Sequence, residues 1–444
     1  MGTEKESRLL FKMAVPVALS MLVQALYNIV DSAFVGQISE DALSAVSVVF
    51  PFQTLFAALN VGIGVGMSQL ISLSMGSRQQ EKAKLAAGQG LFLSLCCTAF
   101  FVIFGLTGSR LFFRISGITG QIADLGQDYL KIITVFSLGI FCESVFERML
   151  MSTGKTGCTM ACQITGAVLN IVLDPILIFG CGFIPPMGVA GAAAATVFSQ
   201  HIAALLAFLL HKKNNPALQF KIADIKPHAE SIKVIFSVGA SAAIKQGAAA
   251  IVLMIVNGIL IRFSTAATAV YGAFNRLYVF FLTPSWAIQD VLVILAAYNL
   301  GIGSRRRIKR LFWLSIAAAL AITFIGCAVI ALFPVPLLRI FGGKEAMLDL
   351  GKTALPILAC FLPFQAAAST VSAMLQGLGD GGGALKAGLI ERFLLPVALV
   401  LLASMTRNLS LVWWSFTAAE ILGLGISVIF LSSTFRRKVS VLSE

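Results

Sequence analysis

Three oxygen-bearing side chains inside apolar stretches have the types and spacing for cation chemistry. Asp31 lies in the stretch Met13–Gly36, and Asn170 and Asp174 lie one helical turn apart in another, which places them on one face of a helix. An ionised Asp in hydrocarbon costs roughly 2.5 to 3.5 kcal/mol on insertion scales, so it is rare without a use. Two nearby carboxylates can share a proton, or with the amide they can hold Na⁺ through oxygen ligands. We predict an ion site here; the alternative is that each Asp reaches water at the end of its helix.

Two further features of the first half bear on this predicted site. Pro16 lies in the same stretch as Asp31, and a proline inside a helix removes a backbone hydrogen bond and favours a kink. The helix could therefore bend when Asp31 changes its charge. Glu147 lies one turn from Glu143 in the fourth apolar stretch. It either extends the oxygen cluster or forms an ion pair with the adjacent Arg148.

Ionisable side chains also lie inside apolar stretches of the second half. Lys245 and Asp290 are opposite in sign and predict an ion pair, although a lysine can also extend its ammonium group to the membrane surface. Glu391–Arg392 and Glu420 give a less specific signal. The candidates for a cavity in this half are Lys245, Gln246, Asn257 and Asp290.

Motifs of ATP-driven or hydrolytic enzymes are absent from the sequence. Gly154-Lys155-Thr156 resembles the end of a phosphate-binding loop, but Met149 stands where that loop needs its first glycine. The three histidines form no HExxH motif. ATP-driven transport and a membrane hydrolase or prenyltransferase are therefore disfavoured.

The composition identifies an integral membrane protein. Of 444 residues, 58% are hydrophobic and 12% are charged, which is about half the charged share of soluble domains. Apolar stretches recur from end to end, and each fits the roughly 20 residues that cross about 30 Å of hydrocarbon. We predict an all-α fold with about twelve transmembrane helices. Their ranges are near 10–36, 46–74, 88–112, 129–152, 158–181, 188–210, 233–262, 266–298, 311–333, 351–377, 384–404 and 410–434.

The basic residues gather in every second connection between these spans. A net charge of +13 could suggest nucleic acid, but cations in short connections are orientation signals, so we expect no nucleic-acid partner. The run 305–310 after the eighth span is one example. By the positive-inside rule, both termini are expected in the cytoplasm. The first span shows no cleavage site of a signal peptide and is expected to be a permanent helix.

The two halves of the chain repeat each other. The sequence around Asp31 returns around Asn257, and Gly76-Ser77-Arg78 returns as Gly303-Ser304-Arg305. The two members of each match are separated by nearly the same number of residues, which indicates an internal duplication. We therefore predict an N-terminal lobe at 1–210, a cytoplasmic linker at 211–229 and a C-terminal lobe at 230–444. Six spans in each lobe make the repeat parallel, with a pseudo-two-fold axis along the membrane normal, as found in secondary transporters.

The acidic residues differ between the repeats. The positions in register with Asp174 and Glu147 hold Leu399 and Ser372. We therefore expect the ion site within the N-terminal lobe and the substrate between the lobes.

Six segments make the chain resemble the multidrug and toxic compound extrusion (MATE) family over nearly its whole length. They are VPVALSMLVQALYNIVDSAFVG (15–36), LNIVLDPILIFG (169–180), MGVAGAAAATVFSQ (187–200), AVYGAFNRLYVF (269–280), AAYNLGIGS (296–304) and MLQGLGDGGGAL (374–385).

This resemblance implies a V-shaped pair of six-helix bundles that exports amphipathic, often cationic compounds in exchange for H⁺ or Na⁺. Asp31 resembles the family's essential acid on the first helix, and Pro16 resembles its bending proline. The other matches to the family's ion pocket are Asn170, Asp174, Tyr129 and Thr196.

The chain also departs from the family pattern. Glu147 stands where relatives commonly have Asn, which adds a negative charge that could alter the choice of ion. Asp290 is unusual, and an acid or Arg is frequent where Lys245 stands.

The expected function is secondary antiport by alternating access in a bacterial cytoplasmic (inner) membrane. We expect a monomer in the lipid bilayer, small-molecule substrates, no resident cofactor, and H⁺ or Na⁺ as the coupling ion. A metal site is expected only as Na⁺ at Asp31, Asn170 and Asp174. The alternatives are a flippase for a lipid-linked precursor and, from a different class, an integral membrane enzyme.

Overall fold

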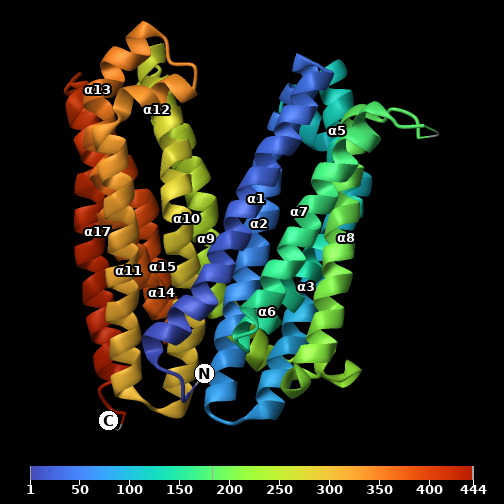
Figure 1. Ribbon diagram of the computed structural model, residues 1–444, viewed down its shortest axis with the longest axis vertical. Helices are drawn as coiled ribbons and strands as arrows, with labels where there is room; N and C mark the ends of the chain where they lie inside the picture. The colour runs from blue at the N-terminus through green and yellow to red at the C-terminus, as the bar shows by residue number, and fades with distance from the viewer. Residues whose placement is uncertain (1, 183, 443–444) are drawn as a thin grey trace. The chain divides into compact units, whose positions relative to one another are not determined.

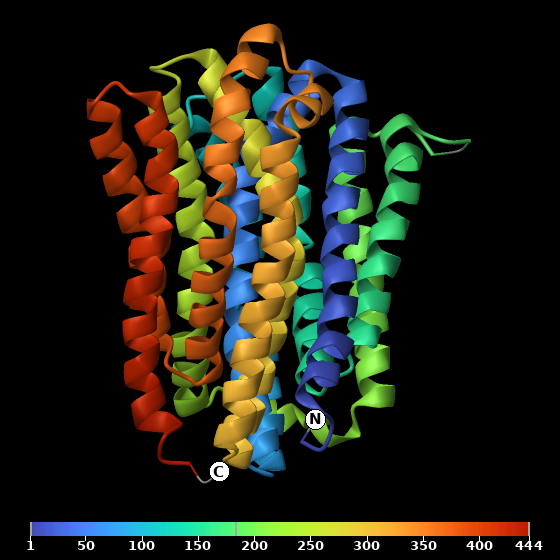
Figure 2. The same cartoon turned by 60° about the vertical axis from the view of Figure 1, so that its left-hand side comes forward.

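The computed structural model describes residues 2–182 and 184–442, and the regular secondary structure of this part of the chain is helical (Figures 1 and 2). The helices of the first half are α1 (Glu6–Ile38), α2 (Glu40–Gly76), α3 (Gln80–Thr107), α4 (Ser109–Ile115), α5 (Gln121–Val135), α6 (Leu138–Ser152), α7 (Thr156–Phe179), α8 (Gly188–Asn214), η1 (Pro216–Leu218) and η2 (Ile222–Ile225). Those of the second half are α9 (Ala229–Leu260), α10 (Thr265–Ile302), α11 (Arg305–Leu332), α12 (Pro334–Ile340), α13 (Glu345–Ala359), α14 (Phe361–Gly377), α15 (Gly381–Leu389), η3 (Ile390–Leu394), α16 (Leu395–Met405) and α17 (Leu409–Lys438).

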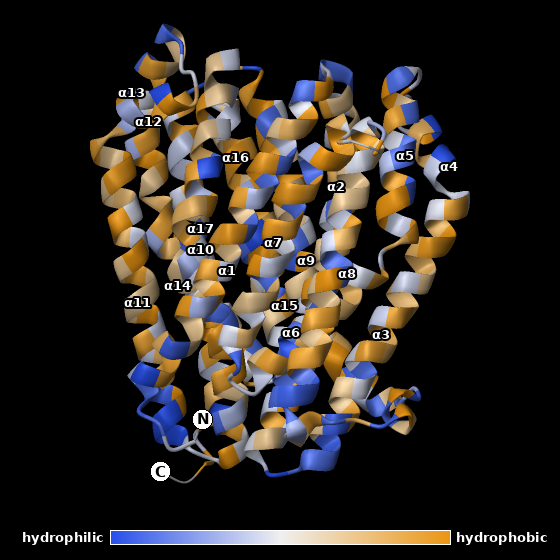
Figure 3. Ribbon diagram, turned by 45° about the vertical axis from the view of Figure 1, so that its right-hand side comes forward, coloured by the Kyte–Doolittle hydropathy of each residue, from blue (hydrophilic) through white to orange (hydrophobic). Residues whose placement is uncertain are grey.

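The predicted membrane-spanning helices are confirmed in number. Within the described residues, eleven helices are long and apolar enough to cross a membrane, if the continuous stretches Glu345–Gly377 (α13 and α14) and Gly381–Met405 (α15 to α16) are each counted as one. The bent pair α5 and α6 makes a twelfth span. Figure 3 shows hydrophobic residues along most of their length and hydrophilic residues gathered at many of their ends, as at the start of α11. The chain is therefore a multi-pass membrane protein.

The predicted fourth span needs correction. Instead of one helix over 129–152, α5 begins at Gln121 and ends at Val135, and α6 follows at an angle of 46°. Thr134 lies just before the break, and its hydroxyl donates to the backbone carbonyls of Leu130, at 2.6 Å, and Lys131, at 3.1 Å. Such bonds from a side chain to the preceding turn often bend helices.

The duplication is visible in the helix boundaries. Gln80 at the start of α3 corresponds to Arg305 at the start of α11, and Thr107 at the end of α3 corresponds to Leu332. Both helices therefore have the same length, 28 residues. The short helices α4 and α12 and the following pairs α5–α6 and α13–α14 occur in the same order in both halves. The all-α repeat predicted from weak sequence matches is thus present in the structure.

The helices gather into two compact units, each with its own packing. We call Leu19–Ile71 with Gln79–Phe236 the N-terminal unit, and Met1–Ala18, Ser72–Arg78 and Ser237–Glu444 the C-terminal unit. In the N-terminal unit, α8 packs against α5, α6 and α7. In the C-terminal unit, α10 packs against α11 and α14, and α17 packs against α14 and α16.

Small residues allow close packing inside the N-terminal unit. A Cβ added at Gly66 of α2 would lie 2.1 Å from the carbonyl oxygen of Ile235 at the start of α9. Gly66, the second glycine of the GxxxG sequence Gly62–Gly66, therefore lies at a close helix contact.

Candidate ion site and a second buried network

Asp174, the carboxylate predicted on the fifth span, lies on α7 inside the N-terminal unit, beside Asn170 of the same helix and Thr196 of α8. Asn170 Nδ2 donates to Asp174 Oδ1 at 3.3 Å, which is the one-turn pair that the spacing predicts. The same nitrogen lies 3.3 Å from Thr196 Oγ1 of α8. Asp174 is fully buried and Asn170 is 2% exposed. Neither side chain reaches water at a helix end.

Asp31 of α1 joins this group across the unit. Its carboxyl group interacts electrostatically with that of Asp174 and with the phenols of Tyr27 and Tyr129. Tyr129 is buried, and its hydroxyl accepts a hydrogen bond of 3.0 Å from Gln53 Nε2 on α2. The structure thus brings five of the sequence candidates together: Asp31, Tyr129, Asn170, Asp174 and Thr196.

The group contains more acceptors than donors. Among the described residues, no donor lies within hydrogen-bonding distance of three of its buried oxygens: Asp31 Oδ1, Asn170 Oδ1 and Asp174 Oδ2. Buried polar atoms are normally satisfied, and each exception calls for an explanation. A proton or a small cation would satisfy these oxygens, because both bind to carboxylate and amide oxygen atoms.

Glu147 of α6 forms a second acidic group beside an earlier turn of α7. It is 7% exposed and accepts a hydrogen bond of 2.7 Å from Gln163 Nε2. Its other oxygen, Oε1, has no hydrogen-bond partner in the described part of the chain. Arg148 adds electrostatic attraction to Glu147, while its side chain packs 3.0 Å from the position of a Cβ at Gly64.

The spacing on α7 connects the two acidic groups. Gln163, Gly166, Asn170 and Asp174 recur at each successive turn and therefore share one helix face. Glu143 Oε1 lies 3.8 Å from the position of a Cβ at Gly166. Glu143 also interacts electrostatically with Tyr27, which interacts with both aspartates of the first group. Glu147 therefore has a partner on the face of α7 that also carries Asn170 and Asp174, in addition to the attraction of Arg148.

Sequence analysis missed three of these partners. Tyr27 lies one turn before Asp31 on α1, and this spacing could have identified it. Gln53 and Gln163 gave no comparable signal, because each meets its partner only across a helix interface.

In the C-terminal unit, the predicted cavity residues have separate environments. Lys245 Nζ donates to Ser372 Oγ at 2.9 Å, and Glu391 and, to a smaller extent, Asp290 attract this ammonium group electrostatically. Gln246 is exposed. Asn257 is half-buried, and its Oδ1 is buried without a hydrogen bond from any described residue.

Glu391, Arg392 and Glu420, which gave a less specific signal in the sequence, form an ionic network in this unit. Arg392 Nε lies 3.0 Å from Glu391 Oε1, and Arg392 Nη1 lies 3.9 Å from Glu420 Oε1 on α17. Arg392 also donates to the hydroxyls of Tyr278, at 3.5 Å, and Ser369. Glu391 and Glu420 are 1% and 2% exposed, so two buried carboxylates lie beside one guanidinium, whose side chain is 16% exposed.

The local backbone at Arg392 is a π-helix, η3, between α15 and α16. Such insertions are rare in α-helices and frequently occur at functional sites. The extra residue lets Glu391 and Arg392, which are adjacent in sequence, both contribute to the interior network. Sequence periodicity could not reveal this, because it assumes a regular α-helix throughout.

In the described part of the chain, eleven apolar helices with one bent pair, a parallel duplication and buried ionisable groups in both units define a membrane transporter. The family model MatE matches this chain twice, at residues 16–176 and 242–402, so the two matches are equally long and repeat the duplication seen in the sequence. The chain belongs to the MatE family and is a MATE transporter; it is a transporter rather than an enzyme.

Relatives with related names match over most of the chain. The "Multidrug export protein MepA" of Staphylococcus aureus strain N315 is 25% identical over 92% of this chain and 89% of its own length. The "Probable multidrug resistance protein NorM" of Thermotoga maritima is 26% identical over 98% of this chain and 94% of its own. A structure described as the outward-facing conformation of a multidrug resistance MATE family transporter has a TM-score of 0.90, 26% identity, and coverage of 98% of this chain and 97% of that chain.

Proposed function

We propose that this protein is a secondary antiporter that exports amphipathic, cationic small molecules in exchange for H⁺ or Na⁺. The observation that carries the proposal is the set of three buried oxygens without donors on Asp31, Asn170 and Asp174. The names of the relatives support drug-like substrates. The protein acts as a monomer without a resident cofactor in a bacterial cytoplasmic membrane. Both of its termini lie in the cytoplasm, which is supported by the basic residues in every second connection.

The coupling follows from the charge of the oxygen cluster. With a proton or Na⁺ bound, the carboxylates are neutralised; without it, they repel one another. The two states therefore favour different conformations, and an ion that binds one of them better shifts the equilibrium. Pro16 lies inside α1, on the N-terminal side of Asp31, and supplies a weak point at which this helix can bend.

The experiment is efflux of a fluorescent cationic dye from proteoliposomes with proton and sodium gradients imposed independently. We expect one gradient to drive efflux by the wild-type protein and Asp31→Asn to abolish that efflux without loss of folded protein. Glu40→Gln is the matched control, because Glu40 is an exposed carboxylate of the same unit. Equal efflux by wild type and Asp31→Asn would reject the site. Efflux that is indifferent to both gradients would reject antiport.

A further inference from the structure

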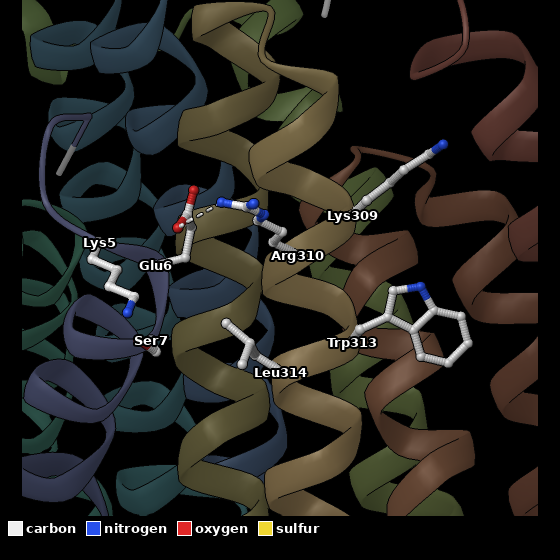
Figure 4. Close-up of a pocket in the computed structure, with 7 residues that line it drawn as sticks. All are labelled: Lys5, Glu6, Ser7, Lys309, Arg310, Trp313 and Leu314. Atoms are coloured by element: carbon white, nitrogen blue, oxygen red, sulfur yellow. Dashed lines mark ion pairs between the residues drawn. The ribbon is translucent and has the colours of Figure 1, made fainter.

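A groove lies between the first residues of α1 and the start of α11, within the C-terminal unit (Figure 4). Its volume is about 650 Å³. Arg310 and Leu314 lie on the side of α11 toward α1, and Lys309 and Trp313 project from another side (Figure 4). The groove thus has a basic end and, one turn farther along α11, an apolar end. Its lining residues are Lys5, Glu6, Ser7, Lys309, Arg310, Trp313 and Leu314.

The basic end carries more positive charge than its neighbours neutralise. α11 starts with Arg305, Arg306 and Arg307 and has no acidic residue in its first turn. This arrangement is unfavourable, because the N-terminus of a helix already carries a partial positive charge and favours anions. Glu6 supplies one carboxylate, 3.5 Å from Arg307 and 3.9 Å from Arg310. The side chain of Arg310 remains 53% exposed.

The apolar end identifies the kind of anion that fits. Trp313 is 66% exposed on a helix that spans the membrane, and exposed tryptophans gather at the depth of the lipid headgroups. Lys309 lies one turn before Trp313 on the same face. A ligand that matches both ends carries a negative charge directly next to a hydrocarbon chain. An inorganic anion would use the basic end alone.

We propose that this groove binds an anionic phospholipid. The lipid phosphate contacts Arg310; Lys309 and Lys5 add positive charge on either side of it, and the acyl chains lie along Leu314 and Trp313. The phosphate competes with Glu6 for Arg310, so the lipid acts where α1 is attached to α11. This site is independent of the ion chemistry proposed for the N-terminal unit.

Quenching of Trp313 fluorescence by brominated lipid tests the proposal without any transport assay. The full-length protein is reconstituted in vesicles of phosphatidylcholine and phosphatidylglycerol in which only one lipid carries brominated chains. Trp414→Phe serves as background, because Trp414 is the other widely exposed indole at 48%. Adding Trp313→Phe to this background measures the remaining signal. We expect brominated phosphatidylglycerol to quench Trp313 more strongly than brominated phosphatidylcholine.

Charge variants then assign the preference to the groove. Each basic residue near an anionic surface is worth about fivefold in affinity, so Lys309→Gln with Arg310→Gln should remove most of the preference, and Glu6→Gln should increase it. Lys309→Gln alone leaves the Glu6 ion pairs intact and keeps the test valid if the double variant does not fold. Lys344→Gln, at an exposed lysine outside the groove, should have no effect.

Two results would overturn the proposal. One is equal quenching by the two brominated lipids, or a preference that survives the loss of Lys309 and Arg310. The other is loss of the preference when inorganic phosphate is added at constant ionic strength, which would assign the basic end to free phosphate.

Discussion

Gln163 of α7 donates a hydrogen bond of 2.7 Å to the carboxylate of Glu147 on α6. This bond places Glu147 at one end of the polar face of α7, and Asp174 lies at the other end. At about 1.5 Å of rise per residue, Gln163 and Asp174 are roughly 16 Å apart along the helix. The N-terminal unit therefore contains two groups of acidic residues, one beside each end of the polar face of α7. Tyr27 interacts electrostatically with Glu143 of one group and with Asp31 and Asp174 of the other.

Glu147→Gln separates the two acidic groups in function. The amide keeps an acceptor oxygen for Gln163 but removes one of two neighbouring carboxyl groups that can ionise. We expect ion-driven efflux to slow severalfold and the thermal stability to rise, because the repulsion between Glu143 and Glu147 is lost. Efflux from proteoliposomes and thermal unfolding in detergent measure the two effects, with Glu40→Gln as control. Unchanged efflux with unchanged ion dependence would leave Glu147 a structural role only.

Much of the fold of this protein could be predicted from the hydropathy and the internal repeat of its sequence. The number of spans follows from apolar length, and the duplication follows from matches on one offset. The break between α5 and α6 could not be predicted, because residues 129–152 are apolar throughout most of their length. The role of Arg392 in an ionic network could not be predicted for another reason. In the sequence, Arg392 and Glu391 look like an ion pair between adjacent residues, and only the fold brings Glu420 of α17 to the other side of Arg392.

Arg392→Met tests the network in the C-terminal unit. The substitution leaves Glu391 and Glu420 buried without their shared cation, and breaking a buried pair in this way costs about 3 to 5 kcal/mol of unfolding free energy. We expect a large drop in thermal stability and in the yield of folded protein. Adding Glu391→Gln and Glu420→Gln to this variant should recover much of the loss, because the two buried carboxylates are then gone, while the Lys245 ammonium loses only the attraction of Glu391 and keeps that of Asp290. A triple variant as unstable as Arg392→Met would show that packing, and not charge, dominates there.

Gly66→Ala tests the close contact of α2 with α9. The new Cβ would lie 2.1 Å from the carbonyl oxygen of Ile235, so the two backbones must move apart. We expect a loss of thermal stability. Gly272→Ala in α10 is the matched control, because among the described residues no atom beyond its chain neighbours and the nearby backbone of its own helix lies within 4 Å of the added Cβ, and alanine favours helices over glycine by about 1 kcal/mol. Equal melting temperatures for the two variants would contradict the assigned contact.

Asp380 predicts a loss of stability in acid at one end of the C-terminal unit, in the turn between α14 and α15. Burial by itself raises the pKa of this carboxyl group. Hydrogen bonds from Thr434 and the backbone N–H of Gly383, with the charges of Arg437 and Lys438, outweigh burial and hold the pKa below its ordinary value of 3.8. Because the pKa is lower in the folded protein, the stabilisation is complete above 3.8 and disappears as the pH falls through the folded-state pKa.

Asp380→Asn checks this sign. The amide keeps an oxygen that can accept from Gly383 N–H, which lies 3.0 Å from Asp380 Oδ1, but it loses the ion pair of 3.2 Å with Arg437. We expect the variant to be less stable than the wild type at neutral pH and the difference to shrink in acid, as the wild-type carboxylate becomes protonated. Thermal unfolding in detergent over a pH series measures this difference, with Glu345→Gln, an exposed carboxylate of the same unit, as control. A difference that stays constant down to the lowest pH at which the protein is folded would show that the charge of Asp380 does not stabilise the turn.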